Sequence, residues 1–153
     1  MEYRLYTFIN FYLSQIQQGI QSAHIVSELF TKYENNALMT GIIKTWARSH
    51  KTIIVCNGGN SAGISEFSDV FQDSPYPYAD FYEDMDSLGG VRTGIGIILP
   101  EAIFKCEKRV DGLFTHYEYQ RSGDEVADTI FKSYNPTHPA FALIHAVKSA
   151  KLA

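Results

Sequence analysis

Four polar side chains follow one another at helical spacing in the first third of the chain, and one of them is a histidine. They recur at steps of four, three and four residues, so a helix would align them: Gln17, Gln21, His24 and Glu28. The imidazole could act as an acid, a base or a ligand contact, and the amides could clamp a polar ligand. A buried histidine and a solvated glutamine face are the alternatives.

A glycine-rich segment supplies the second group of candidate ligand contacts. Its residues follow a short apolar run and precede a helical pattern: Asn57, Gly58, Gly59, Asn60, Ser61 and Gly63. Backbone N–H groups at such a turn, together with a helix N-terminus, suit phosphate or carboxylate. The segment lacks the lysine and spacing of a P-loop, and a plain turn also needs glycine for positive φ. We predict a site between this turn and the polar face that carries Gln21 and His24.

Other residues could contribute chemistry at the edges of this site. Arg92 and Thr93 stand at the head of a predicted strand. An acidic run could hold paired carboxylates, although such runs are usually solvated: Asp80, Glu83, Asp84 and Asp86. Three tyrosines could stack on a nucleobase or simply pack in the core: Tyr76, Tyr78 and Tyr82. Ser61 has no nucleophile-elbow motif around it.

A strand followed by a helix positions the histidine. Tyr6 to Leu13 is rich in β-branched and aromatic residues and predicts a strand. Ser14 and Gln17 have the spacing of a capping box, so the helix begins there. We expect its core-facing stripe to be the apolar residues at steps of three or four: Ile16, Ile20, Ala23, Val26, Phe30 and Tyr33. Gly19 in this helix suggests that a backbone, a ligand or the sheet approaches closely.

The rest of the pattern predicts an α/β fold with a small mixed sheet of about four strands and helices on both faces. Thr52 to Cys56 is a continuous apolar run and predicts a central strand. The other predicted elements are a helix ending near Ser49, a helix from Ile64 to Phe71, strands at Ala79 to Glu83 and Val91 to Leu99, and a short helix at Pro100-Glu101.

The last third of the chain has a different character. Gly112 to Arg121 alternates as a strand or hairpin arm, Asp124 to Ser133 predicts a helix, and Ala140 to Lys151 a final helix. We expect one domain over residues 1–153, with a core complete near Phe104 and an extension at 105–153 that contacts a second subunit. His116 and Tyr117 in this arm fit an interface as well as a site.

The composition of the chain favours some classes of binding partner over others. The chain has 153 residues, 45% of them hydrophobic, and a formal net charge of −4. Its arginines are scattered singly, so extended nucleic acid is a poor partner, whereas a compact anion needs only a few donors. Two cysteines without metal-ligand spacing predict buried, reduced thiols and no metal site. We also expect no cofactor. No signal sequence or membrane-spanning run is present, so we expect a cytoplasmic protein.

The order of the elements and the segment Gln21-Ser22-Ala23-His24 resemble the peptidyl-tRNA hydrolase type 2 family over about residues 5–104. The resemblance implies a small mixed sheet with helices on both faces. Lysines of the family correspond to Gln15 and Gln17 here, and Ile25 follows the histidine where the family has alanine. The family has an Asp-Ala-Gly-Arg-Thr segment between its last two strands. Only Asp86, Arg92 and Thr93 resemble it here.

Three functions follow from these observations. Loss of the lysines removes charge that would hold a polyanion or stabilise an oxyanion, which favours non-catalytic binding of a small anionic, nucleotide-like ligand. Sequestration of a signalling nucleotide by a virus-encoded decoy would suit such a site. One alternative is a peptidyl-tRNA hydrolase or related hydrolase that uses His24 and Asp86. The other is a protein-interaction module built on the C-terminal arm.

Overall fold

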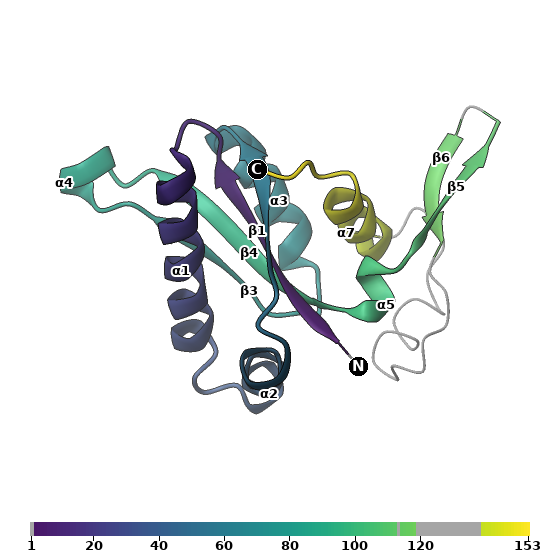
Figure 1. The fold of residues 1–153 in the computed structure, drawn as a ribbon, viewed down its shortest axis with the longest axis horizontal. Helices are drawn as coiled ribbons and strands as arrows, with labels where there is room; N and C mark the ends of the chain where they lie inside the picture. Colours follow the sequence, from purple (N-terminus) through teal and green to yellow (C-terminus); the bar gives the residue numbers. More distant parts are fainter. Residues whose placement is uncertain (1, 113, 119–138) are drawn as a thin grey trace.

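A four-stranded mixed sheet forms the centre of the computed structural model, which describes residues 2–112, 114–118 and 139–153. Its strands are β1 (Tyr3–Asn10), β2 (Ile53–Gly59), β3 (Tyr78–Tyr82) and β4 (Arg92–Pro100). The strand order is β2-β1-β4-β3 (Figure 1). β1 runs parallel to β2 and antiparallel to β4, and β3 is antiparallel to β4. The predicted α/β fold with a mixed sheet of about four strands is confirmed.

Helices cover both faces of this sheet (Figure 1). One face carries α1 (Gln15–Lys32), α2 (Ala37–Thr45) and η1 (Trp46–His50), a turn of π-helix. The other carries α3 (Ser61–Gln72), α5 (Glu101–Phe104) and α7 (Pro139–Lys148). The short α4 (Met85–Leu88) joins β3 to β4, and a hairpin of β5 (Glu107–Asp111) and β6 (Phe114–Glu118) follows α5.

The two faces of β1 belong to two separate apolar clusters. Leu5 and Ile9 pack with the α1 and α2 side, whereas Tyr6 and Phe8 pack with the α3 and α7 side. Successive residues of a strand point to opposite faces, so a strand covered on both faces is apolar throughout. This explains why the middle of β1 is apolar on both faces apart from Thr7, whose hydroxyl is hydrogen-bonded to that of Ser22.

β2 lies at an edge of the four-stranded sheet, so the prediction of a central strand at Thr52–Cys56 is wrong. The run is apolar because Cys56 packs on the α3 side and Val55 on the α1 side. Helices can cover the two faces of a strand even when only one of its edges pairs with another strand of the sheet, as here for β2. The C-terminal residues partly cover the outer edge, where Asn57 N donates to Lys151 O at 2.9 Å and Ala153 N to Val55 O at 3.0 Å.

The core does not close near Phe104, contrary to the expectation from sequence. The predicted last helix is present as α7, and Leu143, Ile144 and Val147 are buried in the same cluster as Phe71. The predicted arm at Gly112 to Arg121 corresponds in its described part to β6, which pairs with β5. The predicted helix from Asp124 to Ser133 lies outside the described residues.

The capping box at Ser14 is confirmed, but the predicted core-facing stripe of α1 is mostly wrong: Val26 and Tyr33 pack against the core, whereas its other four members are exposed. Ser14 Oγ accepts from Gln17 N at 3.3 Å, and Ser14 N donates to Gln17 Oε1 at 3.0 Å. Ile16 is 78% exposed and Ile20 is 49% exposed. The residues of α1 that are buried against the sheet form a different stripe: Gln21, Ser22, Ile25 and Leu29.

Two glycines of β4 explain which side of α1 faces the sheet. A Cβ on Gly96 would lie 2.7 Å from Ile25 Cγ2, and a Cβ on Gly94 would lie 3.1 Å from Ile25 Cδ1. Ile25 therefore occupies space that any larger residue of β4 would fill. Once Ile25 points inward, Ser22 reaches Thr7, with 2.9 Å between their hydroxyl oxygens.

Adding a methyl group to a glycine of β4 tests whether packing against Ile25 sets the orientation of α1. Gly96→Ala should lower the free energy of unfolding by about 1 to 3 kcal/mol, because the added methyl group overlaps Ile25 and the backbone of Tyr6. Gly41→Ala in α2 is the matched control, since a Cβ there meets nothing within 4 Å. It should raise stability by up to about 1 kcal/mol through helix propensity. Urea unfolding measures both, and equal effects would contradict the packing argument.

Candidate binding site

A groove of about 520 Å³ lies between the turn that follows β2, helices α3 and α7, and the C-terminal segment. Its wall is mainly apolar and consists of Phe67, Val70, Ala142, Ala146 and Ala150. Its polar residues are Asn57, Glu66, His145, Ser149 and Lys151. Ligand sites commonly have volumes of about 300 to 1,000 Å³ and combine an apolar wall with a few polar groups. The groove has the size and chemistry of a small-molecule site.

The predicted glycine-rich turn forms one end of this groove. Asn57 Oδ1 accepts from Gly59 N at 2.8 Å, and Gly59 adopts a φ of +74°. Asn60 caps α3, with its Oδ1 accepting from Gly63 N at 3.0 Å. A Cβ on Gly58 would lie 2.8 Å from the backbone of Phe8. The fold of the chain itself therefore favours glycine at positions 58 and 59. The backbone of this turn lines the groove.

The cationic side of the groove comes from the other end of the chain. Lys151 follows α7 and is exposed, and its backbone oxygen accepts the hydrogen bond from Asn57 N. His145 lies in the last turn of α7 and also borders the groove. Sequence reasoning missed Glu66, His145, Ser149 and Lys151, because no spacing in the sequence relates α7 to the turn after β2.

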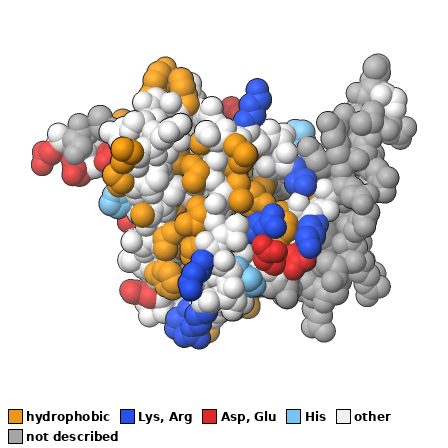
Figure 2. All heavy atoms as spheres, in the orientation of Figure 1, with side chains coloured by type: hydrophobic (Ala, Val, Ile, Leu, Met, Phe, Trp, Pro, Cys, Tyr) orange, Lys and Arg blue, Asp and Glu red, His pale blue; other side chains and the backbone are white. Residues whose placement is uncertain are grey.

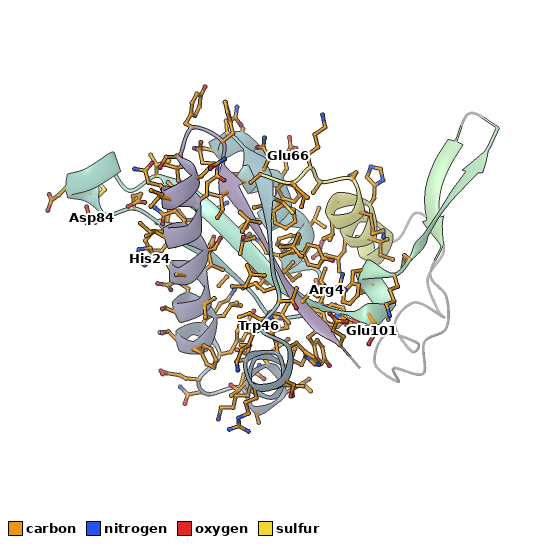
Figure 3. All side chains as sticks on the ribbon, viewed as in Figure 1. Arg4, His24, Trp46, Glu66, Asp84 and Glu101 are labelled. Carbon is orange, nitrogen blue, oxygen red and sulfur yellow. The ribbon has the colours of Figure 1, made fainter. Side chains whose placement is uncertain are left out.

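The structure does not bring Gln21 and His24 to this turn, so the predicted single site is divided. The Gln21 side-chain amide donates to Glu83, which follows β3. The His24 ring stacks on Phe81 in β3, with 4.4 Å between ring centroids and 6° between ring planes. β3 and β2 are opposite edges of the sheet. His24 and Glu66 therefore mark two separate regions (Figure 3).

The remaining predicted site residues also fall outside the groove. Arg92 binds Asp80 at 3.2 Å (Nε to Oδ2) and Tyr82 at 2.8 Å (Nε to OH), and Thr93 is only 2% exposed. Gln17 is used in the capping box, and neither Asn60 nor Ser61 lines the groove. In the described part of the chain, His24 and Asp86 share no hydrogen bond, and both are exposed. Of the residues predicted to contact a ligand, only those of the glycine-rich segment line the groove: Asn57, Gly58, Gly59 and Gly63.

Both cysteine thiols are buried on the α3 face. Burial raises the pKa of Cys56 to about 11 and that of Cys106 to about 11. A thiol with so high a pKa is almost wholly protonated at neutral pH, and the thiolate is the reactive form. Among the described residues, no cluster of His, Cys, Asp and Glu could hold a metal ion.

No protein-family model matches the sequence, and no curated protein is significantly similar to it. Membership of the peptidyl-tRNA hydrolase type 2 family therefore stays a prediction. In residues 2–112, 114–118 and 139–153, no helix has both the length and the apolar character needed to cross a membrane.

The contact between Gln21 and Glu83 makes a testable prediction about stability. Gln21→Glu replaces the donor with a second carboxylate and should lower the free energy of unfolding at pH 7 by about 2 kcal/mol or more. Like charges favour protonation in the folded state, so the loss should shrink as pH falls towards about 4 to 5. Gln15→Glu, on an exposed position of the same helix, should change stability by less than about 0.5 kcal/mol. Urea unfolding at both pH values measures the difference, and a pH-independent loss would contradict it.

The buried thiols make a second prediction. At pH 8 the folded protein should react with a disulfide reagent such as DTNB at least about 100-fold more slowly than the urea-unfolded chain, because both thiols are protonated and shielded. Absorbance of the released thiolate measures the rate. Fast labelling of either cysteine in the folded chain would contradict the assignment.

Proposed function

We propose that this protein binds a small anionic ligand with an aromatic or apolar body, of the nucleotide class, in the groove between α3 and α7. The observation that carries the proposal is the composition of the groove. An apolar wall is joined at one end to a glycine-rich turn and a lysine within a volume of about 520 Å³. Such a volume accommodates one small molecule rather than an extended polymer.

The apolar wall suits a flat ring system. Phe67 lies on α3, and its ring stacks on that of Phe8 with 4.2 Å between centroids, so it is held in place from the core side. The facing wall on α7 is formed by Ala142 and Ala146, whose small side chains leave space beside the ring. A nucleobase or similar ring between these walls would gain from burial and stacking.

The polar end suits an anion. Lys151 supplies a cation, and the first turn of the twelve-residue helix α3 follows the turn at Asn57–Gly59, so its positive dipole end lies near the groove. A phosphate needs few such donors, which agrees with a chain whose net charge is −4. Glu66 on the same groove disfavours a ligand that carries negative charge along its whole length.

Several observations support binding without turnover. The cysteine thiols are protonated at neutral pH, and Gln15 and Gln17 stand where the resembling family has lysines. His24, the predicted acid or base, lies at the other edge of the sheet from the groove. Sequestration of a ligand requires affinity alone, and the groove supplies the contacts for it.

Titration calorimetry with a panel of mono-, di- and cyclic nucleotides tests the proposal. For the nucleotide that binds, Lys151→Ala should weaken affinity by about 1.5 to 3 kcal/mol, which is roughly 10- to 150-fold, because a charge-assisted contact is lost. Ala146→Trp should abolish binding by filling the groove. Lys44→Ala, an exposed lysine on α2 away from the groove, is the matched control and should leave affinity unchanged.

Chromatography of the ligand after incubation separates binding from catalysis. Recovery of the intact nucleotide supports sequestration, whereas turnover would replace this proposal with a hydrolase. Absence of binding by the whole panel, or equal losses in Lys151→Ala and Lys44→Ala, would remove the groove as the ligand site.

A further inference from the structure

The outward face of α1 is apolar and exposed. Ile16 and Ile20 are 78% and 49% exposed, and Phe30, further along the helix, is 38% exposed. Phe11 and Tyr12, just before the helix, are 46% and 77% exposed. Figure 2 shows hydrophobic side chains gathered on the face of the molecule that α1 occupies. Contiguous exposed apolar side chains of this extent mark an interaction surface more often than isolated ones do.

Gly19 lies on this same outward face, and the fold of the single chain does not require it. A Cβ at Gly19 would meet nothing within 4 Å, so the sheet does not approach it. Glycine inside a helix lowers helix stability relative to alanine. Ala23, one turn further on, is also exposed. The small residues at Gly19 and Ala23 leave the helix backbone open to an approaching surface.

The part of this surface up to Ser27 is also free of charged residues. Residues 11–27 contain no Asp, Glu, Lys or Arg, although 20% of the whole chain is charged. An exposed helix normally carries charged residues on its outer face. A surface without charge can meet a copy of itself without placing like charges together.

We propose that two copies of the chain pair through α1, with the two helices antiparallel about a twofold axis near Gly19 and Ile20. In this register Ile20 of each copy lies against Gly19 of the other, and Ile16 lies against Ala23. Each large side chain therefore meets a small one, which lets the helices approach closely. A parallel arrangement about a twofold axis would instead set Ile16 against Ile16 and Gly19 against Gly19.

Spacing and charge favour a second copy over a different protein as the occupant. When one helix is reversed against its copy, each isoleucine faces a small residue and each small residue faces an isoleucine. This self-complementarity is the condition for a twofold interface. The charge-free segment 12–27 faces itself in this register, so no charged residue of α1 is buried by it. Antiparallel helix dipoles also attract.

This pairing is independent of the proposed ligand site. α1 covers one face of the sheet, whereas the groove lies on the α3 and α7 side. The groove therefore stays open in the dimer, and failure of the nucleotide experiments would leave the dimer proposal untouched.

Sedimentation equilibrium of the full chain at micromolar concentrations tests the pairing. The wild type should give a particle of twice the 17.3 kDa chain mass. Ile20→Lys and Gly19→Leu should each weaken the dimer by at least about tenfold, because a charge or a bulky side chain enters the helix contact. Gly41→Leu is the matched control: it also replaces a helical glycine with open space around it, but on α2, and should leave the dimer unchanged. Circular dichroism checks that each variant is folded.

Disulfide trapping tests the register. Ile16→Cys combined with Ala23→Cys should form a covalently linked dimer on mild oxidation. Ile16→Cys alone should not, because the two copies of residue 16 lie about 10 Å apart along the helix axes at about 1.5 Å per residue. A wild-type monomer throughout the concentration range would overturn the proposal. So would a dimer that Ile20→Lys leaves intact, or efficient linkage of the Ile16→Cys single variant.

Discussion

The contact between Ile25 and the two glycines of β4 fixes how α1 lies on the sheet. Gly94 and Gly96 leave a depression in the sheet surface, and Ile25 fills it, together with Ile9 at Gly94. With that rotation fixed, Ser22 meets Thr7, Gln21 meets Glu83, and Leu29 enters the core. At the far end of α1, Tyr33 OH donates to Tyr78 O at 3.1 Å and accepts from Tyr78 N at 3.2 Å, which ties the helix to the outer edge of β3. The same rotation turns Ile16 and Ile20 outward.

The features that could be predicted from the sequence are those determined by neighbouring residues. The capping box depends on Ser14 and Gln17 alone, and the alternation and length of the apolar runs are enough for the fold class. The orientation of α1 could not be predicted in this way, because the helix carries two apolar stripes. Periodicity selects the longer one through Ile16 and Ile20, whereas the sheet accepts the shorter one through Ile25 and Leu29. That choice depends on glycines some seventy positions later in the sequence.

The predicted site is split into two regions for the same reason: its position depends on contacts between residues that are distant in the sequence. The turn at Asn57–Gly59 is predictable because its glycines and the flanking strand and helix are contiguous in the sequence. Its facing wall is α7, and the sequence contains no signal that places Ala146 beside Phe67. The sequence predicts that Gln21 and His24 face the turn only because both segments carry polar residues. Polarity says nothing about which edge of the sheet a helix faces, and here the two residues contact Glu83 and Phe81 beside β3.

The pairing of the C-terminal residues with β2 has a consequence for how the chain is made. Cys56 and Leu152 form an antiparallel bridge, so the middle of the outer edge of β2 is covered by residues almost a hundred positions downstream. On the ribosome, all four strands of the sheet emerge before residues 151–153 do. During that interval a nascent chain presents an open strand edge, and such edges are where neighbouring chains associate. Slow translation of the last third would lengthen this exposure, so the yield of folded protein should depend on elongation rate and chaperone supply.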